Sequence, residues 1–237
     1  MRGCLFTIIL AAVVVALIVV IGLPAIAAGL LTAGVKAAGL QANDITVNVT
    51  ADPPWDLLGL HADRVRVRAT SATFRGLQIG ALDVTLLNVS IVDRTANGVA
   101  GRVTGVTLPN VAGQPLGLAA INLAGGGDQV TATTTVAAAD AQALVASEIA
   151  SVTGVTVPLT AVHLVAPDKV VVKMAITLTA VLSVDEGGNL VATAAGIPPV
   201  TLLRAGEDVP MKFTSVKVDA AGNLVLAGTL SVGLLGG

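Results

Sequence analysis

Alternation of apolar and polar residues runs through most of the chain, and it is the pattern of a β-strand with one buried face. Residues 45–50 carry isoleucine or valine at every second position, with threonine or asparagine between them. Residues 64–69 repeat the pattern with arginine at the polar positions. Both stretches predict strands that bury one face.

The longest alternation covers residues 170–183. Its apolar positions are Val170, Val172, Met174, Ile176, Leu178, Ala180 and Leu182. Lysine, threonine and serine occupy several of the positions between them. We expect a single strand of about 14 residues here, far longer than the usual five or six.

Two turns share a local repeat. Residues 184–191 and 218–225 both read V-D-x-x-G-N-L-V. The Asp, Gly and Asn residues supply the local hydrogen bonds and the positive φ of tight hairpins. Hairpin chemistry alone would produce such a repeat, so it does not establish a duplication. We expect two hairpins: residues 170–184 with 190–195, and residues 211–218 with 223–233.

One helix interrupts the strands. Asp140 is the candidate N-cap, and the helix is expected to end near Gly154. Apolar residues share one helical face between these limits: Leu144, Val145, Ile149 and Val152.

Together these elements predict an α+β fold in which a long, strongly curved antiparallel sheet wraps around one or two apolar helices. The domain is expected to cover residues 44–235. Its triple glycine at residues 125–127 is expected to mark a loop between an N-terminal half, 44–124, and a C-terminal half, 128–235.

The N-terminus predicts contact with a membrane. Residues 4–23 carry no charge and match the ~20 residues with which a helix crosses a bilayer. We expect residues 1–24 to be a single-pass anchor of the cell membrane, with the N-terminus inside and the domain on the extracytoplasmic side. The Ala-Ile-Ala of residues 25–27 fits a signal-peptidase site, so a cleaved secreted or periplasmic form is the alternative.

Residues 25–43 are expected to continue as an apolar helix. This helix is either a second segment of the anchor, bent at Pro24, or a separate helix that docks against the folded domain.

Composition excludes several classes of protein. Of 237 residues, 54% are hydrophobic and only 12% are charged, which excludes an intrinsically disordered chain. A net charge of −2 argues against nucleic acid as the partner, because phosphate binding needs clustered Lys and Arg. Cys4 is the single cysteine, which excludes a structural disulfide and a multi-cysteine metal site.

Residues suited to catalysis are few. His61 and His163 are the only histidines, the acids are spread singly, and no metalloprotease, serine-hydrolase or P-loop motif is present. We therefore expect no catalytic residues, no metal and no cofactor. An envelope enzyme would need a cleft that joins one of these histidines to a carboxylate.

A basic stripe stands out in this acidic chain. Arg64, Arg66 and Arg68 are expected to project from one face of their strand. Such a stripe can attract anionic lipid headgroups beside a membrane, and the alternative is an ordinary solvated face.

One further segment points to a family. Residues 52–60, Asp-Pro-Pro-Trp-Asp-Leu-Leu-Gly-Leu, look like an apolar Pro/Leu/Gly segment that is characteristic of one protein family. The likeness to this family extends to the N-terminal hydrophobic run and to the strand pair 62–69 and 77–92. On these features the sequence resembles the DUF2993, or LmeA-like phospholipid-binding, proteins, although its aromatic content of 2% departs from them. The resemblance implies an extracytoplasmic domain related to the tubular lipid-binding folds, with acyl chains in an elongated β-wrapped cavity. It carries over no site residues.

We therefore expect a membrane-anchored protein that binds phospholipid or another acyl lipid in an apolar cavity, in lipid transport or homeostasis of the cell envelope. The alternative is a non-enzymatic structural module whose long sheet pairs with another envelope protein. The expected lining residues are Leu82, Val84, Leu86, Leu144, Ile149, Val172, Met174, Ile176, Leu178 and Ala180.

Overall fold

The computed structural model describes residues 28–29, 32–33, 40–74, 77–90, 92–93, 95–111, 114–126, 129–154, 156–173, 176–206 and 211–231. The expected anchor at residues 1–24 lies outside the described residues, as does Met174. Within the expected helix at 25–43, the described residues 28–29 and 32–33 are helical. Residues 40–43 are not, because they already belong to the first strand.

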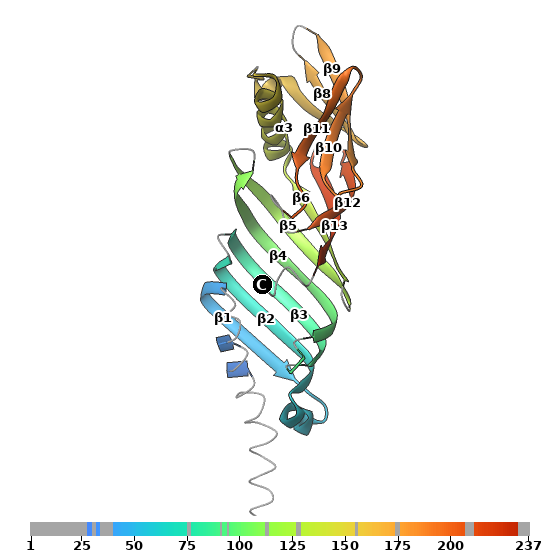
Figure 1. Cartoon of the computed structure of the whole chain (residues 1–237). Coiled ribbons are helices and arrows are strands. Elements are labelled where there is room, and N and C mark those ends of the chain that lie inside the picture. The colour runs from blue at the N-terminus through green and yellow to red at the C-terminus, as the bar shows by residue number, and fades with distance from the viewer. Residues whose placement is uncertain are drawn as a thin grey trace, which may run out of the picture.

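An antiparallel sheet of eight strands forms the long body of the molecule (Figure 1). The strand order is β1-β2-β3-β4-β5-β6-β13-β12, so the C-terminal hairpin completes the sheet that the N-terminal strands begin. The strands are β1 (Leu40–Thr50), β2 (His61–Phe74), β3 (Leu77–Ser90), β4 (Thr95–Val111), β5 (Gln114–Gly126), β6 (Gln129–Val136), β12 (Lys212–Val218) and β13 (Leu224–Ser231). The alternation expected at residues 45–50 and 64–69 is confirmed in β1 and β2.

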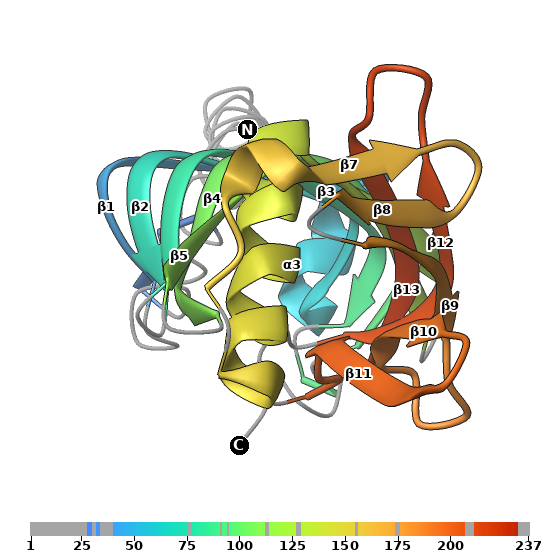
Figure 2. The ribbon, with the colours of Figure 1, turned by 90° about the horizontal axis from the view of Figure 1, so that it is seen from above.

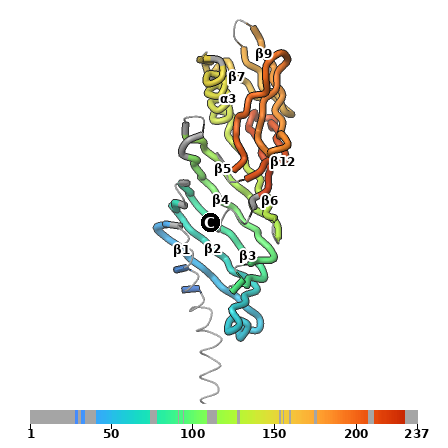
Figure 3. The backbone as a smooth tube through the Cα atoms, in the orientation of Figure 1, coloured from blue at the N-terminus to red at the C-terminus, as the bar shows by residue number. Residues whose placement is uncertain are grey.

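A second antiparallel sheet lies with helix α3 (Ala138–Thr153) at one end of the molecule (Figures 1 and 3). Its strands, in spatial order, are β11 (Ile197–Leu203), β10 (Leu190–Ala194), β9 (Thr177–Val184), β8 (Lys169–Lys173) and β7 (Val162–Val165). Two short 3-10 helices complete the described elements: η2 (Pro54–Gly59) and η3 (Leu159–Ala161). Seen from above, the two sheets curve around α3, which packs against β5, β7 and β11 (Figure 2). The coarse expectation of an α+β fold with a curved antiparallel sheet is confirmed.

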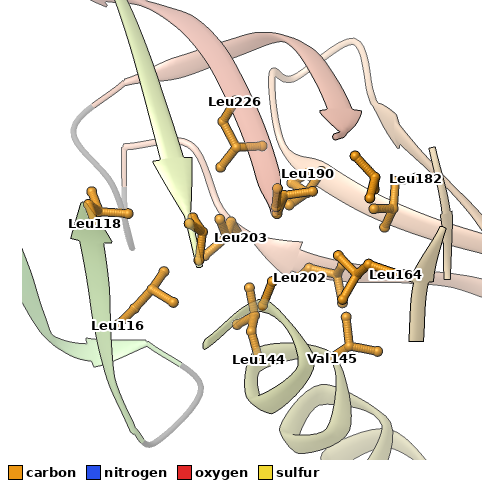
Figure 4. Packing of buried hydrophobic residues seen from close by; sticks show 14 of the residues in the cluster. Leu116, Leu118, Leu144, Val145, Leu164, Leu182, Leu190, Leu202, Leu203 and Leu226 are labelled. Carbon is orange, nitrogen blue, oxygen red and sulfur yellow. The ribbon is translucent and has the colours of Figure 1, made fainter. Parts of the chain in front are cut away.

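The main core lies between α3, the second sheet and the adjoining ends of β5, β6 and β13 (Figure 4). Helix α3 contributes Leu144 and Val145 to this core. The second sheet contributes Leu190 and Leu203, which are fully buried. A smaller core at the other end of the large sheet gathers Val47, Val49, Leu57, Ala62, Val65 and Val89, and we call it the lower core. Aliphatic side chains fill most of both, as the low aromatic content requires.

The two expected hairpins are confirmed, but the long strand is not. β9 pairs with β10 and β12 pairs with β13 across the two repeated turns. The single strand expected over residues 170–183 is wrong, because the chain reverses after Lys173 and β9 runs back along β8. Val170 therefore lies opposite Ala180, and Val172 lies opposite Leu178.

The start of α3 differs from expectation. Helix α3 begins two residues before Asp140, which lies in the first turn and does not cap it, although the helix ends at Gly154 as expected. The glycines at 125 and 126 pair with Val130 and Gln129, so they lie at a hairpin within one sheet. The architecture changes only after β6, where α3 and the second sheet begin.

Three neighbouring strands of the large sheet break the alternation of inward and outward side chains at Ser71, Gly80 and Gly105. We call this line of irregular backbone the crease. Ser71 of β2 and Gly105 of β4 have φ of 48° and 62°, in the left-handed region. Gly80 of β3 lies between them, and a Cβ on Gly105 would meet its Cα at 3.3 Å. Across each break two residues separate successive inward positions instead of one: Ala69 and Ala72 of β2 are buried, as are Val103 and Val106 of β4, and Ile79 and Leu82 of β3 are half-buried. Such local irregularities bend a sheet, and they contribute to its curvature.

Candidate functional site

The large sheet has one apolar face, and three of the expected lining residues lie together on it. Leu82, Val84 and Leu86 occupy alternate positions of β3 and share this face. Their partners on β2 are Ala69, Val67 and Val65, in that order. The side chains of Leu82, Val84 and Leu86 are half-buried, in contrast to the enclosed side chains of the main core.

Four further residues extend this apolar face, and the sequence reasoning did not select them. They are Val67 of β2, Val99 of β4, and Ile121 and Leu123 of β5. Val99 lies opposite Leu86. Val103 of β4 lies between Leu82 of β3 and Ile121 of β5, and it pairs with both. Each of the four is also half-buried. The alternation in β4 and β5 could have indicated them, because it is the same pattern that indicated β3.

The remaining expected lining residues lie at the end that carries α3. Leu144 and Val172 are 5% and 2% exposed inside the main core, where Ile149, Leu178 and Leu82 pack against them and their neighbours. Ala180 is half-buried on β9. Ile176 lies in the turn between β8 and β9 and is 72% exposed. Leu82 is thus the expected residue at which the apolar face of β3 meets the main core, whereas Leu86 packs on the lower core.

The opposite face of the large sheet is polar and carries the arginine stripe. Arg66 donates from Nε and Nη2 to the two carboxylate oxygens of Asp83, at 2.7 and 2.6 Å. Arg68 donates from Nε to the same carboxylate at 3.3 Å. The Arg66 hydrogen bond holds the pKa of Asp83 below its usual value and raises the pKa of Arg66. Asp83 therefore offsets part of the positive charge of the stripe, while Arg64 is exposed on the same strand.

The two histidines lie far apart in the fold. His61 begins β2 beside η2, and its Nδ1 lies 2.7 Å from the carbonyl oxygen of Gly59. His163 is exposed on β7, at the end that carries α3. Within the described ranges, no three His, Cys, Asp or Glu side chains gather where they could hold a metal ion.

No protein-family model matches the chain, and neither a curated protein nor a solved structure matches it. In the part of the chain that the structure describes, no helix combines the length and the apolar character that crossing a membrane requires.

Proposed function

We propose that this protein is a membrane-anchored, extracytoplasmic lipid-binding protein that holds acyl chains against the apolar face of its large sheet. The observation that carries the proposal is the half-buried aliphatic surface that continues across β2, β3, β4 and β5. Burial of apolar area is the main favourable term in binding a lipid tail, at about 0.8 kcal/mol for each methylene removed from water. A surface of this kind favours a flexible hydrocarbon over a rigid polar ligand.

The dimensions of the face suit this ligand. Neighbouring strands lie about 4.8 Å apart, so the three steps from β2 to β5 span about 14 Å. A single acyl chain spans half of a hydrocarbon core that is about 30 Å thick, or about 15 Å. A chain lying across the strands would therefore contact the apolar face along most of its length.

The remaining parts of the proposal rest on the sequence. The run at residues 4–23 would anchor the chain, and the likeness of residues 52–60 to the DUF2993 or LmeA-like proteins supports a phospholipid as the ligand. In this interpretation the domain is related to the tubular lipid-binding folds and serves envelope lipid transport or homeostasis. The arginine stripe would attract anionic headgroups, chiefly through Arg64, because Asp83 binds Arg66 and Arg68.

Photo-crosslinking tests the proposal. The full chain in membranes is labelled with a phospholipid that carries a diazirine on its acyl chain, and the crosslinked peptides are mapped. We expect crosslinks on β3, β4 and β5. Val84→Glu should greatly reduce them, whereas Thr85→Glu, the adjacent residue on the polar face, should leave them unchanged. Circular dichroism must show that both variants are folded. Crosslinks of the parent chain that are confined to the N-terminal run would contradict the proposal.

A second candidate function is a structural module of the envelope. The observation in its favour is that β1, a strand of 11 residues, forms one edge of the large sheet. Edge strands can pair with a strand from another protein. A stable protein partner crosslinked to β1, together with an absence of lipid crosslinks on β3, would favour this function.

A further inference from the structure

Four large apolar side chains are exposed together at the end of the large sheet opposite α3. Three belong to η2 and the residue after it: Trp55, Leu58 and Leu60 are 63%, 66% and 41% exposed. The fourth, Val92, is 64% exposed in the turn that follows β3. That turn lies beside η2 because Ser90 pairs with His61. We call these four residues the apolar tip.

The apolar tip is held outward by the fold. Leu57, between Trp55 and Leu58, is only 5% exposed and packs in the lower core. The chain entering η2 is fixed by the backbone N–H of Asp52, which donates to the Asp63 carboxylate at 2.6 Å. The backbone N–H of Leu60 donates to the carbonyl of Leu57 at 3.1 Å. The Leu57 side chain therefore anchors η2, while its neighbours face solvent. Exposure of their apolar surface to water is unfavourable unless something covers it.

The chain that follows the N-terminal run contacts the core beneath this tip. Ala28 packs against the lower core, which contains Leu57. Leu23, the end of the apolar run at residues 4–23, is five positions before Ala28 in the sequence. A chain of that length reaches at most about 18 Å even when fully extended. If the run lies in a bilayer, as the proposed function requires, the apolar tip must lie near the surface of that bilayer.

We propose that the apolar tip inserts into the boundary between headgroups and acyl chains of the bilayer that holds the N-terminal run. Tryptophan is enriched at this depth in membrane proteins because its ring is apolar and its indole N–H remains hydrogen-bonded. The exposed acids around the tip, Asp52, Asp56, Asp63 and Asp93, outnumber Arg64, the exposed arginine at the same end of β2, so the bilayer surface that suits the tip is mainly zwitterionic, with only a minority of anionic headgroups for Arg64 to attract. The occupant is therefore a zwitterionic phospholipid interface, and insertion follows from apolar contact more than from charge.

Insertion would also serve the proposed lipid binding. The lower core joins Leu57 to Val65, and Leu86 of the apolar face packs against the same core. The apolar face thus begins at the end of the molecule that would contact the bilayer. An acyl chain leaving the bilayer at the tip would meet the half-buried Leu86 before Leu82, which lies toward the main core.

The chain provides its own reporter, because Trp55 is its only tryptophan. The experiment reconstitutes the full chain in phosphatidylcholine vesicles whose acyl chains are brominated either near the headgroup or near the methyl end. We expect lipids brominated near the headgroup to quench Trp55 fluorescence more strongly. Leu58→Asp should abolish most of this quenching. Ile176→Asp, at a site of similar exposure in the β8–β9 turn at the other end of the molecule, should leave it unchanged.

Three outcomes would overturn the inference, and they are distinguishable. A chain that floats with the vesicles but whose Trp55 is quenched by aqueous iodide and not by brominated lipid is anchored without tip insertion; acyl crosslinks to β3 could then still support lipid binding. A chain that does not float with vesicles contradicts the membrane anchoring on which the inference rests. Equal loss of quenching in Ile176→Asp would also contradict insertion at the tip, because the effect would then not depend on the tip.

Discussion

The side-chain Oδ1 of Asn223 accepts a hydrogen bond from the backbone N–H of Ala138, the first residue of α3, at 3.1 Å. The two residues are 85 positions apart. The Asp219 carboxylate binds the Asn223 Nδ2 at 2.9 Å and so fixes which way the amide faces. The residue at the N-cap position, Ala137, makes no side-chain hydrogen bond to the helix. A distant hairpin instead provides the acceptor for the first backbone N–H of α3.

The other repeated turn uses the same device. Asp185 binds the Asn189 Nδ2 at 2.9 Å, and Asn189 Oδ1 accepts the backbone N–H of Ala205 at 2.9 Å. The repeated sequence V-D-x-x-G-N-L-V therefore does more than turn the chain. In both copies its Asp orients its Asn, and the Asn fastens a separate segment to the hairpin.

The Asn223 contact predicts a specific loss of stability. Asn223→Ala removes the acceptor for the first N–H of α3, so the free energy of unfolding should fall by about 1 kcal/mol, as for the loss of a helix cap. Hydrogen–deuterium exchange should rise in the first turn of α3. Asn189→Ala is the matched control, and it should raise exchange near Ala205 while leaving α3 unchanged. Equal exchange at α3 in the two variants would contradict the assignment.

The turn aspartates predict a pH dependence. The Asn223 side chain, then its backbone N–H, holds the pKa of Asp219 below its usual value, and Asn189 does the same for Asp185. A lowered pKa in the folded state stabilises it above the ordinary Asp pKa of about 3.9, and the stabilisation is lost as pH falls through the lower folded value. Asp219→Asn should therefore unfold at lower denaturant than the parent at pH 7. The difference should shrink below about pH 4; a difference that grows on acidification would contradict this account.

The crease predicts different effects at two of its positions. Gly105→Ala places a Cβ on left-handed backbone, 3.3 Å from the Cα of Gly80, and should lower the free energy of unfolding by about 1–2 kcal/mol. Ser71→Gly removes a Cβ from the same kind of backbone and should not lower it. Urea unfolding followed by circular dichroism measures both. Destabilisation of equal size in the two variants would show that strain at the crease is not the cause.

The anchoring of η2 predicts a contrast between adjacent leucines. Leu57→Ala empties space in the lower core and should cost about 2–5 kcal/mol, whereas Leu58→Ala should stay within about 0.5 kcal/mol of the parent. Thermal unfolding of the two variants tests the contrast. A large loss in Leu58→Ala would mean that this side chain is packed and not available to a membrane.

The sequence predicted the local elements better than their arrangement. Alternation located β1, β2 and the hairpins because each strand buries one face. The reversal after Lys173 was missed because Val170 lies opposite Ala180 and Val172 opposite Leu178. All four positions are even-numbered, so the alternation continues across the turn as if no turn existed.

Long-range contacts explain the other differences. Asp140 was the expected cap, but no local pattern indicates that Asn223 would reach Ala138 from 85 residues away. The crease depends on the side-by-side placement of Ser71, Gly80 and Gly105, which only the strand register determines. Of the expected lining residues, Leu82, Val84 and Leu86 share a face because they share a strand. Which of the others join that face depends on the tertiary fold.

The pairing of β13 with β6 has a consequence for how the chain matures. Val136 at the end of β6 pairs with Leu224, so α3 and the whole second sheet intervene between two hydrogen-bonded neighbours. A chain synthesised from its N-terminus therefore presents β6 as an open edge until nearly the last strand has emerged. An open edge can pair with a strand of another chain. The pairing of β6 with β13 forms slowly, because a long segment of chain separates the two strands. Chains truncated before β13 should therefore be prone to aggregation, and the C-terminal hairpin is the part of the molecule that ends that exposure.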